Sequence, residues 1–323
     1  MKKRIGILTS GGDTPGMNAG IRAVVTAADA AGFSVMAVRR GYEGLMAGRV
    51  SRIKPEDVEG IAERGGTVLG TARCEAFKTV DGQAQALKVI QAFGISGLVV
   101  IGGDGSFQGA GVLNELGVPT VGIPGTIDND LAYTDFTIGF DTVVNGVAGE
   151  ISRIRDTMRS HERVGVIETM GNRCGDIALY AGLAGGADHL IIPEVEADLS
   201  YICEKIVRDR IKGKMTSIVL VAEGAGKSME VAGYIREKTS IDTKAVVIGY
   251  RQRGGTPTAA DRIRVTNMGI RAVELLAEGA GGRAVGLRGG EIIDVEISEA
   301  LNCPPIFQRA LYERFQMMEG NPL

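Results

Sequence analysis

Short, continuously apolar runs recur along the whole chain, and they constrain the fold more than any other feature. Segments such as "RIGILT" (residues 4–9) and "SIVLVAE" (217–223) are apolar at consecutive positions rather than at every second one. That pattern is typical of strands buried on both faces of a sheet. Similar runs occur at 34–38, 97–103, 119–123, 163–168, 189–192 and 245–250. We therefore expect parallel sheets with both faces covered.

Segments with a helical period lie between these runs. Met17, Ile21 and Val24, for example, repeat on one face of such a segment. Alternating strands and helices predict an α/β fold with mainly parallel sheets. At 323 residues the chain is long enough for two domains. Glycine-rich corners repeat weakly in both halves, which indicates two related halves that divide near Phe140.

Composition excludes several classes of function. A net charge of −3, no Trp and 5% aromatic residues argue against a nucleic-acid-binding protein. The presence of only two histidines, His161 and His189, and of four scattered cysteines argues against a zinc site or a His-based triad. No segment approaches the ~20 apolar residues of a membrane span. The first apolar run is too short for a signal peptide, so we expect a cytoplasmic protein.

Two glycine-rich corners follow strands. The segment "LTSGGDTPGMNAGIRAVV" (8–25) reads as strand, turn and helix, which suits phosphate binding, although a simple tight turn would look the same. It lacks the G-x-G-x-x-G spacing of a dinucleotide site. In "VVIGGDGSFQGAG" (99–111) the corner carries Asp104, which beside phosphate would serve as a Mg²⁺ ligand. The alternative is that Asp104 or Ser106 caps the helix.

A third corner, "GIPGTIDND" (122–130), places Thr126, Asp128 and Asp130 close together. If the first two corners hold a nucleotide and Mg²⁺, a carboxylate here can take the proton from an attacking hydroxyl, as phosphoryl transfer requires. We assign Asp128 to that role and expect Asp130 to orient the loop or water molecules on the metal.

Two further segments bear on anion binding. "VAEGAGKSM" (221–229) has Val where a Walker A loop needs its first Gly, so Lys227 is expected to be a surface lysine. "YRQRGG" (250–255) follows an apolar run, and the arginine fork suits a phosphate ester.

The ordered set "SGGDTPGMN", "GGDGS", "PGTIDND", "DFTIGF", "AEGAG" and "QRGG" resembles the bacterial-type 6-phosphofructokinase family over nearly the entire chain. The resemblance implies two Rossmann-like three-layer αβα domains. One is a larger ATP-binding domain, 1–139 plus about 251–302, and the other a smaller sugar-phosphate domain, 140–250 plus about 303–323. It also implies ATP-dependent phosphorylation of fructose 6-phosphate at O1 with Mg²⁺, by a homotetramer.

The resemblance also assigns roles to residues. Those that match the nucleotide site are Gly12, Arg73, Cys74, Gly103, Asp104, Gly105 and Ser106, with Asp104 for magnesium. Thr126 and Asp128 would address the reacting hydroxyl and the transferred phosphoryl group. Those that match the sugar-phosphate site are Arg163, Met170, Gly171, Asn172, Glu223, Lys244, Tyr250 and Arg253. Arg163 and Lys244 would reach in from a neighbouring subunit.

Departures from the family pattern leave alternatives open. Members that use pyrophosphate have Asp at 105 and Lys at 125, whereas this chain has Gly at both positions, which predicts ATP as donor. Lys244, Tyr250 and Asn172 stand where Arg, His and Arg are usual, and Arg173 follows one residue late. A kinase for a related ketose phosphate, with ATP or pyrophosphate, or a weakly active regulatory nucleotide-binding subunit, therefore stays as an alternative.

The family's effector site is also altered. Matching residues are Arg22, Arg155, Asp188, Lys212 and Lys214, where Asp188 replaces glutamate. Thr26 and Pro55 replace two arginines. Each charge-assisted contact to phosphate is worth roughly 1.5–3 kcal/mol. We therefore hypothesise weak control by ADP or phosphoenolpyruvate.

Overall fold

A computed structural model of the chain describes residues 2–320, and its residues group into two compact units. The described residues of Met1–Ile127, Leu131–Thr142 and Arg253–Pro305 form unit 1. Those of Asp128–Asp130, Val143–Gln252 and Ile306–Leu323 form unit 2. The chain therefore passes from one unit to the other within the "GTIDND" corner, directly after Ile127.

Unit 1 contains a seven-stranded sheet in the order β11-β10-β5-β4-β1-β2-β3. The pairs β2–β3 and β10–β11 are antiparallel and the others are parallel. Its strands are β1 (Arg4–Thr9), β2 (Ser34–Val38), β3 (Val50–Ile53), β4 (Ile95–Gly102), β5 (Thr120–Pro124), β10 (Arg283–Arg288) and β11 (Glu291–Glu296). Its helices are α1 (Met17–Ala30), α2 (Gly41–Met46), α3 (Val80–Phe93), α4 (Asp104–Glu115), α9 (Ala259–Ala277) and α10 (Ile297–Asn302).

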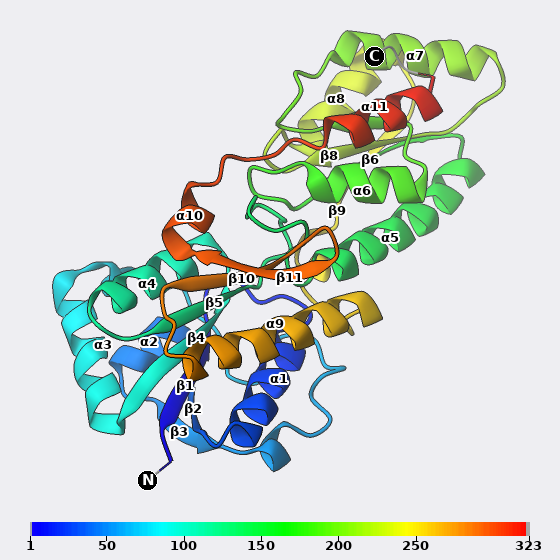
Figure 1. Ribbon diagram of the computed structural model, residues 1–323. Helices are drawn as coiled ribbons and strands as arrows, with labels where there is room; N and C mark the ends of the chain where they lie inside the picture. Colours follow the sequence, from blue (N-terminus) through cyan, green and yellow to red (C-terminus); the bar gives the residue numbers. More distant parts are fainter. Residues whose placement is uncertain (1, 321–323) are drawn as a thin grey trace. The chain divides into compact units, whose positions relative to one another are not determined.

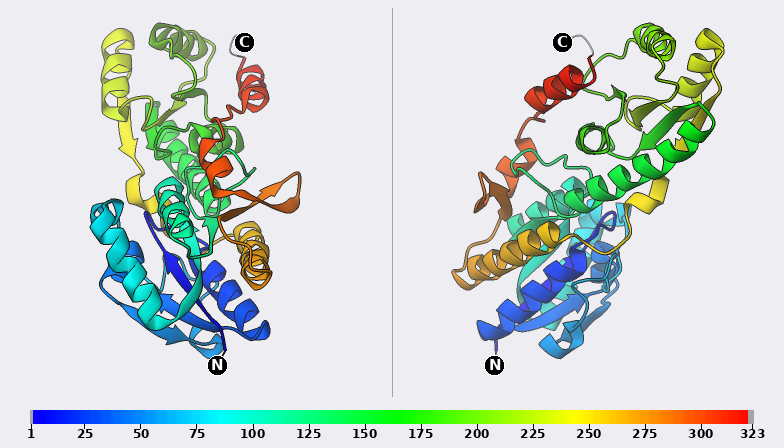
Figure 2. Two further views of the ribbon diagram at one scale, coloured as in Figure 1. Left: turned by 60° about the vertical axis from the view of Figure 1, so that its left-hand side comes forward. Right: turned by 90° about the vertical axis from the view of Figure 1, so that its right-hand side faces the viewer.

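Helices cover both faces of this sheet (Figure 1). On β4, Val99 and Ile101 pack into the cluster that includes α1 and α9. Leu98 and Val100 pack into the opposite cluster, which includes α2, α3, α4 and α10. Figure 2 shows α1 and α9 on one side of the strands and α3 on the other. Because both faces of each central strand are buried, consecutive positions must be apolar, and this is the pattern of the sequence.

Unit 2 contains a four-stranded, fully parallel sheet in the order β7-β8-β6-β9. Its strands are β6 (Val164–Thr169), β7 (His189–Ile191), β8 (Ser217–Ala222) and β9 (Thr243–Val247). Its helices are α6 (Asp176–Gly185), α7 (Leu199–Ile211), α8 (Ser228–Thr239), α11 (Arg309–Met318) and most of α5 (Phe140–Ser160). The helices α7 and α8 pack on one face of the sheet, and α5 and α6 on the other. The expected three-layer αβα architecture is therefore confirmed in both units.

Each of the eight apolar runs overlaps a strand, but β3, β10 and β11 do not coincide with any of them. The outer strands β3 and β11 consist only of exposed and half-buried residues. An edge strand is not buried on both faces, so it lacks the continuous apolar signal. The run at 245–250 also extends too far, because β9 ends at Val247 and Gly249–Gln252 forms a 3₁₀ turn.

Candidate active site

Three glycine-rich corners of unit 1 lie at the same edge of its sheet. The strands β5, β4 and β1 are parallel neighbours, so their carboxyl ends coincide. After β1, the Ser10 N–H donates to the Ile101 carbonyl at 3.0 Å. After β5, the Gly125 N–H donates to the Gly102 carbonyl at 3.0 Å. These main-chain bonds join the corners that carry Gly12, Asp104 and Thr126.

The middle corner requires glycine. A Cβ at Gly102 would lie 2.6 Å from the Ser10 carbonyl oxygen and 2.4 Å from Ser106 Oγ, so no side chain fits there. A Cβ at Gly103 would lie 3.6 Å from Thr126 Cβ. The threonine is thus next to the corner that precedes α4. The Thr137 hydroxyl donates to the Thr126 carbonyl at 2.6 Å and helps to fix it.

Asp104 is the first residue of α4 and is exposed. The N-cap residue is Gly103, without a side-chain cap, so the interpretation of Asp104 or Ser106 as the helix cap is wrong. One Asp104 oxygen accepts from Gln108 Nε2 at 2.9 Å. Its carboxylate stands at the amino end of a helix, where phosphate is stabilised. Ser106 is buried, and its carbonyl accepts from the Tyr42 hydroxyl at 2.6 Å.

Other candidates of unit 1 reach the same edge. The Thr71 hydroxyl donates to the Gly11 carbonyl at 2.8 Å, which brings the segment of Arg73 and Cys74 to the first corner. Arg73 is exposed, whereas the Cys74 sulfur lies 3.8 Å from the Met46 sulfur. Thr71 itself was not predicted, because nothing in its local sequence signals this contact.

Arg253, assigned by sequence to the sugar-phosphate site, lies in unit 1 beside the first corner. Its Nη1 donates to the Asp13 carbonyl at 3.3 Å. A Cβ at Gly12 would lie 2.6 Å from the same nitrogen. The arginine therefore lies against Gly12, one of the glycines assigned to the nucleotide.

In unit 2, several sugar-phosphate candidates meet at the carboxyl edge of its sheet. The Asn172 N–H donates to Glu223 Oε1 at 3.0 Å, which joins the loops after β6 and β8. Gly171, directly before Asn172 in the chain, has a φ of 137°. A Cβ at this position would lie 2.3 Å from the Cys174 carbonyl oxygen. The Met170 N–H donates to Gln252 Oε1 at 3.1 Å.

The bond between Met170 and Gln252 holds the turn Gly249–Gln252 at the same edge of the sheet. Gln252 is 4% exposed and was not predicted, although it stands inside the "YRQRGG" segment. Tyr250, two residues earlier, is 85% exposed. Asn172 and Arg173 are exposed as well. The turn is anchored by the buried glutamine, while Tyr250, Asn172 and Arg173 are exposed around it.

Arg163 and Lys244 lie at the opposite, amino edge of the same sheet. Arg163 directly precedes β6, and Lys244 is the second residue of β9. Both bind Asp242, with Arg163 Nε at 2.5 Å and Lys244 Nζ at 2.8 Å. The hydrogen bonds from Lys244 and Arg163 hold the pKa of the Asp242 carboxyl below its usual range. Because six residues of β6 intervene, the backbone of Arg163 lies roughly 20 Å from that of Met170.

The short segment Asp128–Asp130 belongs to unit 2. Asp128 is half-buried and Asp130 is exposed. Between them, Asn129 has a φ of 54° and its Nδ2 donates to Asp176 Oδ2 at 2.8 Å. Asp176 is 4% exposed, and burial raises the pKa of its carboxyl to about 6. This aspartate was not predicted, since it lies far along the chain from the corner it contacts.

Of the effector candidates, Arg155, Asp188, Lys212 and Lys214 belong to unit 2, and Arg22 belongs to unit 1. Arg155 donates to the Gly185 carbonyl at 2.8 Å, and Lys214 forms an ion pair with Asp188. Lys212 and Lys214 line a surface hollow together with Lys205, Arg208 and Glu319. The hollow is basic, but it also contains carboxylates.

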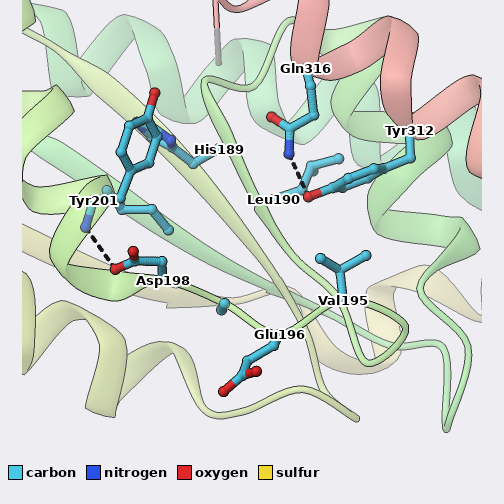
Figure 3. A pocket seen from close by; sticks show the side chains of 10 residues that line it. His189, Leu190, Val195, Glu196, Asp198, Tyr201, Tyr312 and Gln316 are labelled. Carbon is cyan, nitrogen blue, oxygen red and sulfur yellow. Dashed lines mark hydrogen bonds between the residues drawn. The ribbon is translucent and has the colours of Figure 1, made fainter. Parts of the chain in front are cut away.

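A separate cavity of about 130 Å³ lies between β7, α7 and α11 (Figure 3). It is lined by His189, Tyr201, Tyr312 and Gln316, among others, and by none of the predicted site residues. Burial lowers the pKa of His189 to about 4, so the imidazole is neutral at pH 7. A neutral, buried ring is consistent with a structural role for this histidine.

Among residues 2–320, no group of three or more His, Cys, Asp or Glu side chains is arranged to hold a metal ion. A single carboxylate still fits Mg²⁺, which commonly binds one or two carboxylates and completes its shell with water and phosphate oxygens. Asp104 meets that description. None of the helices within the same residues combines the length and apolar character that a bilayer crossing requires.

Comparison with known proteins agrees with this arrangement. The sequence profile of the phosphofructokinase family matches residues 4–276. The chain is 54% identical over 311 residues to an ATP-dependent 6-phosphofructokinase of Clostridium botulinum (strain Loch Maree / Type A3), covering 96% of this chain and 98% of that protein. It is 53% identical, with the same coverage, to the protein of that name from Alkaliphilus metalliredigens.

Among solved structures, phosphofructokinase from Saccharomyces cerevisiae superimposes with a TM-score of 0.92 at 34% identity. The superposition covers 98% of this chain and 50% of the yeast chain. The chain therefore spans half the length of that relative.

Proposed function

The chain belongs to the phosphofructokinase family, and from this premise we propose that it transfers the γ-phosphoryl group of ATP to O1 of fructose 6-phosphate. The products are fructose 1,6-bisphosphate and ADP, as in glycolysis. One observation carries the proposal: main-chain bonds join three glycine corners at one sheet edge and place Asp104 and Thr126 beside them. The relatives of nearly equal length carry the same activity in their names.

Unit 1 would hold the nucleotide. The amino end of α4 and the glycines at 11, 12 and 103 present backbone N–H groups suited to phosphate oxygens. Arg73 is exposed on a segment tied to Gly11 and would neutralise phosphate charge. Asp104 would hold Mg²⁺, which supplies charge neutralisation on the phosphate oxygens when bound.

Asp128 would act as the general base. Its carboxylate accepts the proton of the O1 hydroxyl as that oxygen forms a bond to the γ-phosphorus. The bond between the γ-phosphorus and the β,γ-bridging oxygen breaks, and ADP leaves with that electron pair. Thr126, two residues earlier in the chain, would orient the transferred group through its hydroxyl. No other covalent chemistry is required of the protein.

The positions of the acceptor ligands support a site shared between subunits of a homotetramer. Met170, Glu223 and the turn of Tyr250 lie at the carboxyl edge of the unit 2 sheet, whereas Arg163 and Lys244 lie at its amino edge. A sugar phosphate is far shorter than the roughly 20 Å between these edges. If both sets bind one acceptor, Arg163 and Lys244 must come from a second copy of the chain.

The environment of two glycines supports ATP as the donor. Beyond its chain neighbours and its own helical turns, no atom of the described residues lies within 4 Å of a Cβ at Gly105, so the space there is open to a nucleotide. A Cβ at Gly125 would lie 2.9 Å from Ile101 Cγ2 and 3.3 Å from the Gly102 nitrogen. The lysine of pyrophosphate-using members would therefore require this corner to move.

Two finer statements complete the proposal. We place the enzyme in the cytoplasm, where both substrates are found. We also propose weak regulation by ADP or phosphoenolpyruvate, because Thr26 and Pro55 supply no cation and Lys214 is already paired with Asp188. Activity curves that shift strongly with millimolar amounts of either ligand would contradict weak regulation.

The function is tested with purified protein and Mg²⁺, with ATP or pyrophosphate as donor and a panel of ketose and aldose phosphates as acceptors. We expect turnover with ATP and fructose 6-phosphate above all other pairs. Preference for another ketose phosphate would show that fructose 6-phosphate is not the acceptor. Absence of turnover with every pair would overturn the proposal and favour a regulatory subunit.

A further inference from the structure

Asp176 contacts the segment that carries Asp128, although no family motif or ligand role drew attention to it. Its Oδ2 accepts a hydrogen bond from Asn129 Nδ2 at 2.8 Å, across 47 residues of sequence. Both residues belong to unit 2. The aspartate is 4% exposed and Asn129 is half-buried, so the bond is partly shielded from water.

Asn129 is the residue whose conformation needs support. Its φ of 54° is in the left-handed region, which costs energy for any residue other than glycine and which asparagine tolerates best. Asp128 precedes it directly, so a change of the backbone at Asn129 would swing the carboxylate of Asp128. An anchored side-chain amide restricts that change.

Asp176 provides a firm anchor. It is the first residue of α6, and the residue before it, Gly175, donates its N–H to Glu194 Oε1 at 2.8 Å. A Cβ at Gly175 would lie 2.6 Å from Ile192 Cβ, so the start of the helix is packed closely. A carboxylate is favoured at a helix amino end. Although burial raises the pKa of the Asp176 carboxyl to about 6, it remains mostly ionised at pH 7–8.

The bond is directed away from the helix that carries it. An aspartate at the N-cap position commonly accepts from backbone N–H groups of its own helix, but Asp176 is the residue after the N-cap. Here the N-cap residue is Gly175 and no side-chain cap is formed. Asp176 Oδ2 instead accepts a hydrogen bond from Asn129, the residue beside Asp128. A charged acceptor makes such a bond stronger than a neutral pair.

We propose that Asp176 is a positioning residue for phosphoryl transfer: it holds the Asn129 amide and thereby fixes the direction of the Asp128 carboxylate. The inference rests on the proposed function, in which Asp128 takes the proton. It assigns Asp176 no contact with substrate.

Steady-state kinetics of Asp176→Ala, Asp176→Asn and Asn129→Ala test the proposal. Asp176→Ala should lower kcat about 10–100-fold and leave the KM for ATP within about twofold, since small misplacements of catalytic groups cost rates of this order. Asp176→Asn keeps an oxygen that can accept from Asn129 and should recover kcat to within about threefold of the wild type. Equal losses in both Asp176 variants would overturn the proposal.

A double-mutant cycle separates positioning from general stabilisation. In an Asn129→Ala background, Asp176→Ala should lower kcat by less than twofold further, because the bond is already absent. A full second loss would show that Asp176 acts by another route. The matched control is Asp198→Ala, which removes an aspartate at the start of α7 that accepts from the Tyr201 N–H at 2.9 Å. It should leave kcat unchanged.

Proton exchange of the Asn129 side-chain amide by NMR tests the contact without any activity. Exchange should be at least tenfold faster in Asp176→Ala than in the wild type, and unchanged in Asp198→Ala. Unaltered exchange would overturn the inference even if the enzyme is active. If the wild type shows no turnover but exchange accelerates as expected, the contact stands and the proposed function fails.

Discussion

The candidate nucleotide site of unit 1 and the candidate acceptor site of unit 2 differ in the groups they offer to a ligand. In unit 1 the site consists of glycine corners joined by main-chain hydrogen bonds, with short side chains such as Asp104 and Thr126 beside them. In unit 2 the candidates include several long charged or aromatic side chains. Arg163 and Lys244 are both held by Asp242, and Tyr250 faces outward.

The difference between backbone and side-chain ligands indicates where substrate specificity can change. A corner made of backbone tolerates few substitutions, because a Cβ at Gly102 would meet the Ser10 carbonyl. An exposed side chain of unit 2, such as that of Tyr250, can be exchanged at lower cost. The departures at the acceptor site, Asn172, Lys244 and Tyr250, fall in unit 2, whereas Thr26 and Pro55 of the effector site fall in unit 1.

The largest effect that tests this comparison is expected from Asp128→Ser. Loss of the general base should lower kcat by ~10²–10⁴. Affinity for ATP should change little, because ATP is assigned to unit 1. Steady-state kinetics and ATP titration measure the two effects, with Asp130→Asn as a neighbouring control of smaller effect. A fall in turnover of less than tenfold would remove Asp128 from its role.

Acid is expected to weaken unit 2 through His189. Because burial holds the folded pKa at about 4, against about 6.5 when unfolded, the unfolded state binds the proton first as pH falls. The contribution of the neutral His189 to the free energy of unfolding is therefore fully present above pH 6.5 and declines towards pH 4. At pH 4.5 it has fallen by about 2–3 kcal/mol. The raised pKa of Asp176 acts in the opposite sense, so a variant is needed for comparison.

Urea unfolding of the wild type and His189→Gln at pH 7.5 and 4.5, at one protein concentration, measures this term. The wild type should lose about 2–3 kcal/mol more than the variant over that interval. Equal losses in the two proteins would show that the imidazole is not held neutral by burial.

A smaller effect should follow from Gly105→Asp. The open space around this position predicts an intact fold, while the new carboxylate repels nucleotide phosphates. We expect the KM for ATP to rise about tenfold, in line with a screened repulsion at several ångströms. Gly105→Asn has the same shape without the charge and should stay near the wild type. An equal rise in both variants would indicate steric rather than electrostatic exclusion.

The smallest effect is expected from Lys244→Arg. An arginine fork can make a second charge-assisted hydrogen bond to phosphate that an ammonium cannot. The KM for fructose 6-phosphate should fall about threefold, which corresponds to a net gain below 1 kcal/mol. The KM for ATP should not change. Lys227→Arg, at a lysine paired with Glu168 in the same unit, is the control. An unchanged KM for the acceptor would exclude Lys244 from its site.

Much of the fold follows from the sequence, because burial on both faces leaves a local signal. The runs at 4–9 and 34–38 coincide with β1 and β2 residue for residue. The strands β3 and β11 left no such signal, since their residues stay partly in water. The corners at Gly12, Asp104 and Thr126 were recognisable for the same reason, as each is a short glycine-rich segment next to a buried strand.

Only the tertiary structure decided which of these segments meet. The strand order β5-β4-β1 brings three distant corners to one edge, and no local pattern encodes that order. Thr71, Gln252 and Asp176 acquired partners 60, 82 and 47 residues away, respectively. The sequence determined which residues are buried and where the backbone turns. Contacts between distant residues depend on the strand order and on how the layers pack. Both are properties of the whole fold, so no local segment encodes them.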